Sequence, residues 1–253
     1  MTRVPRTLAV ANQKGGVAKT TTVASLGVAL SELGQRVLLV DLDPQACLTF
    51  SLGYDPEDLE TSMHHVLLGK MKARDVLVSC DDGPDLLPAT IELAAAEISL
   101  AAESGPEQVV RTALRPLASA YDWIVVDCPP TLGLLTVNGL SAASDVLIPL
   151  QCETLAHRGV GQLLDTIHDV KRLTNPDLQV LGVLPTLYDG RTIHARAVLE
   201  TISHSYDLEV LAPPIPKSIR FAEAPAVGRS ILSTSTRSAG ANAYRQLATT
   251  LLF

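Results

Sequence analysis

Short apolar runs alternate along the chain with longer segments in which polar residues recur at helical spacing. The short runs are rich in Val, Leu and Ile and are apolar at consecutive positions, which is typical of strands buried on both faces of a parallel sheet. We predict strands over residues 8–11, 37–41, 123–127, 146–150, 180–184 and 209–211.

The longer segments between these runs predict helices. The expected helices cover residues 19–33, 91–103, 107–118, 155–173, 192–204 and 241–252. Asn175-Pro176 ends the fourth of them, because proline disfavours a helical residue before it. Residues 53–62 and 79–86 are polar, carry Gly, Pro and Asp, and are expected to form loops.

The alternation of strands and helices predicts an α/β fold. Its sheet is expected to be mostly parallel and twisted, with helices on both faces, because parallel strands need crossover connections. The chain has 253 residues and no linker long enough to divide it. We therefore expect one domain, residues 1–253.

The most informative segment is LAVANQKGGVAKTTTVASL, residues 8–26. A predicted strand ends at Ala11, a glycine-containing loop follows, and a helix begins near Lys19. Backbone N–H groups in such a loop and at a helix N-terminus can hold phosphate. Lys19 could then reach the β- and γ-phosphates and the Thr20 hydroxyl could contact Mg²⁺.

The strict phosphate-loop pattern G-x-x-x-x-G-K-[ST] is not met. Gln13 stands at the first glycine position and Ala18 at the second. The loop carries two lysines, Lys14 and Lys19, which would repel each other without an anion between them. This favours nucleotide binding over the alternative, a glycine-rich turn without a ligand.

Carboxylates follow two of the predicted strands. Asp41 and Asp43 end the run RVLLVDLDPQ, and Asp127 ends YDWIVVDCPP. Ligands of α/β proteins bind at the carboxyl ends of parallel strands, and Mg²⁺ prefers oxygen ligands. The alternative is that each aspartate is a structural residue satisfied by hydrogen bonds.

Composition excludes several classes of protein. With 47% hydrophobic and 19% charged residues the chain is not expected to be disordered. No run of about 18 apolar residues predicts a transmembrane helix, and the apolar stretch near the N-terminus is too short for a secretory signal. The four cysteines are widely spaced and form no CxxC pair, which favours reduced thiols in a cytoplasmic protein.

Charge is distributed unevenly. The net charge is −7, but it is −10 over residues 1–190 and +3 over residues 191–253. Any contact with a polyanion is therefore expected near the C-terminal end. Aromatic residues make up only 4% of the chain, which argues against a surface that stacks single-stranded bases.

Residues 14–21, KGGVAKTT, resemble the deviant Walker A motif of the ParA/MinD family of P-loop ATPases, which has a second lysine at the start of the loop. VLLVDLDPQ, IVVDCPPTLGLLT, GVLPTLYDGRT and IPKSIRFAEAPAVGRSIL resemble further family segments in the same order, and GANAYRQLATTLL resembles the closing helix. Together they are most similar to the short chromosomal ParA/Soj partition ATPases. The resemblance implies a P-loop NTPase domain.

The resemblance also implies roles for single residues. Asp43 would position or activate the attacking water, and Lys14 would be the second catalytic residue. Asp41, Asp127 and Thr20 would hold Mg²⁺, and Gly133 with Pro129-Pro130 would shape a loop that senses the γ-phosphate. ATP would contact the loop and an adenine neighbour, namely Lys14, Gly15, Gly16, Val17, Ala18, Lys19, Thr20, Thr21 and Pro216.

The partners implied by the resemblance are a second copy of the chain and duplex DNA. Lys14 would cross the interface of an ATP-bound homodimer onto the partner's phosphates. Arg191, Lys217 and Arg220 would bind DNA without sequence preference, which places the protein on the nucleoid in the cytoplasm. A ParB-like activator with a basic tail is implied as well.

Other readings remain open at this stage. A MinD-like membrane regulator would need a basic amphipathic C-terminal helix, and YRQLATTLLF holds only Arg245. An iron–sulfur ATPase would need two cluster cysteines, for which Cys80 and Cys128 are the nearest candidates. A dethiobiotin-synthetase-like ligase would need a small-molecule pocket for which no motif is seen. The chain carries no histidine with partners at metal-ligand spacing.

Overall fold

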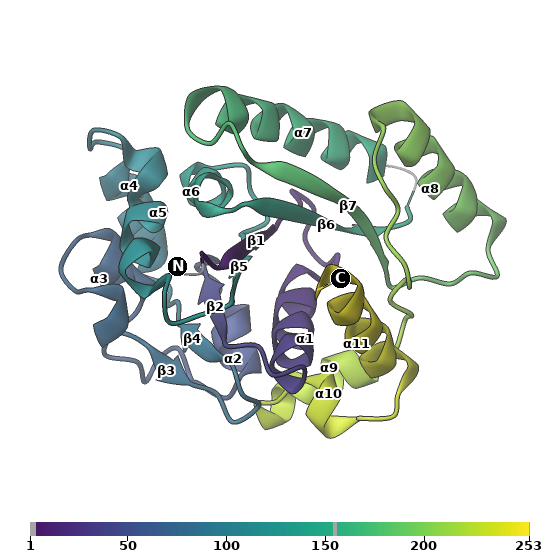
Figure 1. Cartoon of the computed structure of the whole chain (residues 1–253), viewed down its shortest axis with the longest axis horizontal. Coiled ribbons are helices and arrows are strands. Elements are labelled where there is room, and N and C mark those ends of the chain that lie inside the picture. The colour runs from purple at the N-terminus through teal and green to yellow at the C-terminus, as the bar shows by residue number, and fades with distance from the viewer. Residues whose placement is uncertain (1–3, 154–155, 253) are drawn as a thin grey trace.

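The computed structural model describes residues 4–153 and 156–252, and within these the chain forms a three-layer α/β fold around one sheet (Figure 1). The sheet has seven strands in the order β3-β4-β2-β5-β1-β6-β7 in the described part. All neighbouring pairs are parallel except β3 with β4. The strands are β1 Arg6–Val10, β2 Val37–Asp41, β3 Val78–Ser79, β4 Asp85–Leu87, β5 Trp123–Asp127, β6 Asp145–Gln151 and β7 Gln179–Thr186.

Helices connect the strands and cover both faces of the sheet. They are α1 Lys19–Glu32, α2 Cys47–Ser51, α3 Met63–Leu67, α4 Leu93–Leu100, α5 Val109–Leu114, α6 Leu134–Ala142, α7 Ala156–Leu173, α8 Ile193–Tyr206, α9 Arg220–Glu223, α10 Ile231–Thr234 and α11 Ala239–Leu252. Helices α1 and α11 lie on one side of the sheet, and α6 and α7 lie on the other (Figure 1).

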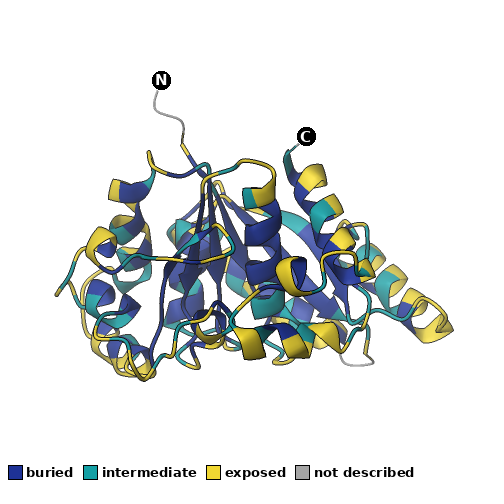
Figure 2. Cartoon of the chain, turned by 90° about the horizontal axis from the view of Figure 1, so that it is seen from below, coloured by how far each residue is buried: buried dark blue, intermediate teal, exposed yellow. Residues whose placement is uncertain are grey.

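Alternate residues of the central strands supply the two cores. In β1, Leu8 and Val10 pack with α1 and α11, whereas Ala9 points into the opposite core with α4 to α7. This is the period-two geometry of a strand, and it requires apolar residues at every position when both faces are covered. The strands are accordingly buried along almost their whole length, while the outer helix faces are exposed (Figure 2).

Two contacts between segments far apart in the sequence hold the C-terminal helices against the rest of the fold. The Thr22 hydroxyl of α1 and the Tyr244 hydroxyl of α11 form a buried hydrogen bond of 2.9 Å. Gly53, which follows α2, and Gly228 approach each other so closely that a Cβ built on Gly228 would lie 2.6 Å from the Gly53 Cα atom. The segment around α9 is thereby packed against the end of α2.

The predicted fold class is confirmed, and several element predictions need correction. The predicted strand at 209–211 is wrong: only an isolated bridge joins Val210 to Val183. The loop predicted at 79–86 contains part of the hairpin β3–β4. The predicted helix 107–118 is divided, because Pro116 interrupts the hydrogen-bond ladder after α5. Leu155, predicted to begin a helix, lies outside the described residues.

Candidate nucleotide-binding site

The loop between β1 and α1 exposes a run of backbone N–H groups. Gly16 has φ 74° and Ala18 has φ 63°, so two residues in the left-handed region turn the chain into α1. No atom lies within 4 Å of a Cβ built on Gly15 or Gly16, which leaves open space above the loop. Ala18 caps α1 without a side-chain hydrogen bond, so the first N–H groups of this helix are available to an anion.

The loop is held to the sheet from below. The Asn12 side chain donates to the Pro149 carbonyl at 2.7 Å and accepts from the Lys14 amide at 2.9 Å. On the other side of the loop, the Thr186 hydroxyl at the end of β7 donates to the Val17 carbonyl at 2.9 Å. These contacts fix the loop before any ligand binds.

The two lysines of the loop are in different environments. Lys19 is buried, and its ammonium donates to the Lys14 carbonyl at 3.1 Å. Burial lowers the pKa of Lys19, and the negative charge of Asp127 acts in the opposite direction. The Lys14 ammonium is half exposed and forms an ion pair with the Glu153 carboxylate just beyond β6.

Asp127 ends β5 with a carboxylate that is almost completely buried. Neither of its oxygens has a hydrogen-bond partner of good geometry within the described residues. Burial raises the pKa of Asp127 well above its ordinary value, as does Asp41, whereas the Thr20 hydroxyl and Lys19 act in the opposite direction. An unpartnered buried carboxylate is costly, and a cation or a metal-bound water removes that cost.

Asp41 ends β2 and is fully buried, but its oxygens are occupied. Oδ1 accepts from the Asp43 amide at 3.0 Å, and Oδ2 accepts from the Thr49 amide at 3.0 Å and the Thr49 hydroxyl at 2.8 Å. Burial raises the pKa of Asp41 to about 6, although the hydrogen bonds from Thr49 favour the charged form. Asp43 is also buried, and its carboxylate caps the turn through the Gln45 amide at 2.9 Å.

The sheet brings the predicted residues of the loop and the acidic residues to one edge. In the strand register Asp127 lies beside Asp41 on one side and beside Val10 on the other. The carboxyl end of β1 leads directly into the phosphate loop, so lysines, the Thr20 hydroxyl and carboxylates surround the same space. Such an arrangement can hold a phosphate chain and a hydrated Mg²⁺ ion together.

The segment after β5 also enters this edge. Pro129 and Pro130 lead to Gly133, and α6 begins at Leu134, where no helix was predicted from the sequence. The Glu97 carboxylate of α4 accepts from the Leu135 amide at 3.1 Å. A Cβ on Gly133 would lie 2.7 Å from the Glu97 Oε1 atom, so the Glu97 side chain packs closely over Gly133.

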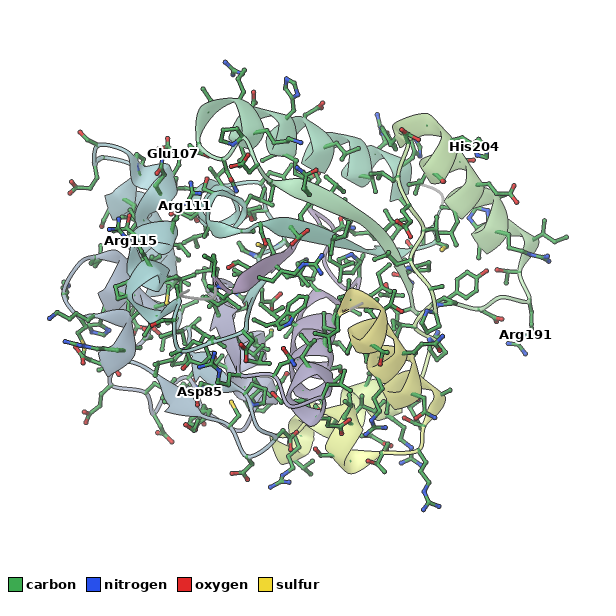
Figure 3. All side chains as sticks on the ribbon, in the orientation of Figure 1. Asp85, Glu107, Arg111, Arg115, Arg191 and His204 are labelled. Carbon is green, nitrogen blue, oxygen red and sulfur yellow. The ribbon has the colours of Figure 1, made fainter. Side chains whose placement is uncertain are left out.

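The remaining predicted residues lie in the C-terminal third. Pro216 forms an isolated bridge with Tyr188, and Lys217 is exposed beside it. Arg191 lies at the outer end of the molecule (Figure 3) with a side chain 90% exposed, paired with Asp189 at 2.7 Å. Arg220 pairs with Glu223 on α9 at 2.8 Å. These three charged side chains are exposed on the surface.

Three residues around the loop were not predicted from the sequence. Asn12 anchors the loop, Glu153 binds Lys14, and Thr49 binds Asp41. Glu153 follows the strand β6, so the rule that identified Asp41 and Asp127 could have found it as well. Thr49 and Asn12 carry no comparable signal in the sequence.

A strand, a phosphate-accepting loop with a lysine at the start of its helix, and carboxylates on adjacent strands define a P-loop nucleotide-binding protein. Comparison with known proteins agrees with this class. A family model described as an AAA domain matches residues 5–180. The chromosome-partitioning ATPase Soj of Thermus thermophilus is 44% identical over 96% of this chain and 94% of its own. The chain belongs to the family of Soj/ParA chromosome-partitioning ATPases.

Solved structures support the same fold. A crystal structure described as cobyrinic acid a,c-diamide synthase of Mycobacterium smegmatis, with bound ADP and magnesium, is 57% identical, with a TM-score of 0.89 over 98% of this chain and 94% of its own. The septum site-determining protein MinD of Pyrococcus horikoshii, complexed with Mg-ADP, is 26% identical, with a TM-score of 0.78 over 98% of this chain and 96% of its own. Within the described residues, no helix is both long and apolar enough to cross a membrane.

Proposed function

We propose that this chain binds and hydrolyses ATP in the presence of Mg²⁺, pairs with a second copy in the ATP state, and then binds duplex DNA without sequence preference. Such a switch serves chromosome or plasmid segregation or the positioning of another cargo. The observation that carries the nucleotide assignment is the buried, unpartnered Asp127 carboxylate beside Lys19. This pair has the charges needed to hold a cation and a phosphate next to each other.

The site residues divide the work of phosphoryl transfer to water, which is mainly positioning and charge neutralisation. The N–H groups of the loop and the Lys19 ammonium would bind the phosphates, and the Thr21 hydroxyl would bond the α-phosphate. Thr20 and Asp127 would hold Mg²⁺, which neutralises phosphate charge when bound. Asp43 would orient the attacking water, and Pro216 would lie beside the adenine. A contribution of Asp41 to the magnesium site stays a prediction. Both of its oxygens already accept hydrogen bonds from the protein, so it would act on bound Mg²⁺ indirectly.

Dimerisation is proposed to depend on Lys14. This lysine stands on the open side of the loop and is half exposed, so it can reach a phosphate of a second chain. ATP would then join the two copies, and loss of the γ-phosphate would weaken the pair.

DNA binding is proposed for the basic C-terminal surface formed by Arg191, Lys217 and Arg220. A dimer presents twice as many cations as a monomer, so ATP would control the affinity for DNA through avidity. A ParB-like protein would accelerate hydrolysis. This function places the protein in the cytoplasm on the nucleoid.

The function is tested by measuring MgATP binding by calorimetry and retention on duplex DNA with ATP and with ADP. We expect binding of MgATP and retention with ATP only, at moderate salt. An Asp43→Ala variant should bind ATP and accumulate as a dimer in size-exclusion chromatography. No heat of MgATP binding would contradict the proposal at its first step.

A diamide synthase is a second candidate, because a protein described by that activity is 57% identical to this chain. Burial raises the pKa of all four thiols, Cys47, Cys80, Cys128 and Cys152, so none resembles the activated nucleophile needed to release ammonia from glutamine. We therefore favour the switch. ATP turnover that requires cobyrinic acid and an ammonia source would support the synthase.

The membrane and iron–sulfur alternatives have less support. The apolar residues of α11, including Tyr244 and Leu247, are buried against α1, and Arg245 pairs with Glu32. This helix therefore has no free apolar face for a lipid surface.

Cys80 and Cys128 are both buried, so neither thiol is placed to share a cluster between two chains. Sedimentation with anionic liposomes and ATP tests the first alternative, and the colour of the purified protein tests the second.

A further inference from the structure

Thr49 forms the buried polar connection between the ends of two strands. It lies in α2, after the segment that carries Asp43, and its side chain is fully buried. Its hydroxyl donates to Asp41 Oδ2 at 2.8 Å and accepts from the Ala89 amide at 2.9 Å, just beyond β4. Its own amide donates to the same Asp41 oxygen at 3.0 Å.

These contacts give Asp41 a different task from Asp127. Three donors from the segment 43–49 occupy both oxygens of Asp41, whereas neither oxygen of Asp127 has such a partner. Hydrogen bonds to a buried carboxylate are strong and fix its orientation. Asp41 is therefore the fixed centre around which the segment with Asp43 is folded.

The geometry joins Thr49 to Asp43 through one carboxylate. Asp41 accepts from the Asp43 amide through Oδ1 and from Thr49 through Oδ2, so a rotation of this carboxylate disturbs both ends of the segment. We propose that Thr49 is a positioning residue, which holds Asp43 in the orientation needed for ATP hydrolysis. This inference rests on the proposed function, because it assigns a role within the same reaction.

The Thr49 hydroxyl forms hydrogen bonds with Asp41 and Ala89, and neither residue belongs to the phosphate loop. Its removal is therefore expected to affect the hydrolytic step and not the binding of nucleotide. A small misplacement of a group that orients the nucleophile is sufficient to reduce turnover strongly. The loss of one hydrogen bond to a buried charge corresponds to a reduction of roughly tenfold or more.

The experiment compares Thr49→Val, which keeps the shape and removes the hydroxyl, with Thr49→Ser, which keeps the hydroxyl. MgATP affinity is measured by calorimetry and hydrolysis by single-turnover assays with radiolabelled ATP. We expect Thr49→Val to lower the hydrolysis rate about tenfold or more, with the dissociation constant for MgATP within about twofold of the wild type. Thr49→Ser should restore most of the rate. Thr201→Val, on the exposed face of α8, is the matched control and should leave the rate unchanged.

Coupling to Asp43 is tested in a double-mutant cycle. If Thr49 acts through Asp43, adding Thr49→Val to Asp43→Ala should lower the residual rate no further. A fully additive loss would overturn the proposal, and so would a wild-type rate in folded Thr49→Val. Should this variant fail to fold, Thr49→Ala also removes the hydroxyl, and a wild-type rate in folded Thr49→Ala would contradict the proposal equally. Absence of MgATP binding by the wild-type protein would instead contradict the proposed function itself.

Discussion

Lys14 of the phosphate loop forms an ion pair with Glu153 of the same chain, just beyond the carboxyl end of β6. The Glu153 carboxylate is thus paired with the same Lys14 ammonium group that is proposed to bind a phosphate on a second copy. The Lys14 ammonium group cannot contact Glu153 of its own chain and a phosphate of the second copy closely at the same time. If the chain dimerises as proposed, Glu153 would oppose pairing of the two copies until phosphate competes for Lys14.

Replacing Glu153 by Gln should make ATP-driven dimerisation easier. The pair is half exposed, and such pairs contribute no more than about 1 kcal/mol, so the ATP concentration at half-maximal dimer should fall by up to about fivefold. Analytical ultracentrifugation over an ATP titration measures this shift. Glu103→Gln removes an equal charge from an exposed loop and should have no effect. An unchanged or higher ATP requirement in Glu153→Gln would show that the ion pair does not compete.

Replacing Arg220 by Glu should abolish ATP-dependent retention on duplex DNA and leave MgATP affinity intact. The change places a negative charge beside Glu223, where the wild type has an ion pair. We expect at least about a tenfold loss of DNA affinity at 0.1 M salt and a shallower salt dependence. Arg115→Glu, at an exposed position directly after α5 (Figure 3), is the control with the same charge change. Equal losses in both variants would indicate a general charge effect.

Replacing Asp127 by Asn should stabilise the nucleotide-free protein at neutral pH. The folded-state pKa of Asp127 is raised, so its ionisation opposes folding as pH increases above the unfolded value of about 4. The variant should match the wild type near pH 4 and exceed it by about 1–2 kcal/mol at pH 7.5, measured by urea unfolding. With MgATP present the order should reverse, because the variant lacks the carboxylate proposed to hold Mg²⁺.

Replacing Ala18 by Gly should also stabilise the protein. Ala18 has φ 63°, a conformation that costs a residue with a Cβ about 1 kcal/mol, and it stands where the usual phosphate loop has glycine. The free energy of unfolding should rise by about 0.5–1 kcal/mol in urea titrations. Ala29→Gly in the interior of α1 is the control with the opposite expected sign. A destabilised Ala18→Gly would mean that no strain is stored at this position.

The central sheet and the loop could be predicted because their signals are local. The strands β2 and β5 match their predicted bounds, since each is a run of apolar residues, buried on both faces, that ends on an aspartate. The glycines and lysines of residues 14–21 lie together in the sequence as they do in space. The family resemblance then supplied the roles of the predicted residues.

The rest depended on contacts between distant segments. Helix α6 is buried on most sides and has no amphipathic pattern, so its residues did not indicate a helix. Val210 forms only an isolated bridge to Val183 of β7, and further backbone hydrogen bonds to this edge are made by Leu211 and Ile215. Thr49 and Glu153 acquire their importance only from partners 8 and 139 residues away.

The contact between Gly53 and Gly228 limits how this protein can change over evolutionary time. Both residues have positive φ, and a Cβ on Gly228 would lie 2.6 Å from the Gly53 Cα atom, so a side chain at Gly228 would separate the end of α2 from the segment that carries Arg220, while one at Gly53 would be strained. The two positions are 175 residues apart in the sequence, yet neither can be altered independently of its neighbour in space. In an alignment of relatives, we expect glycine at both positions.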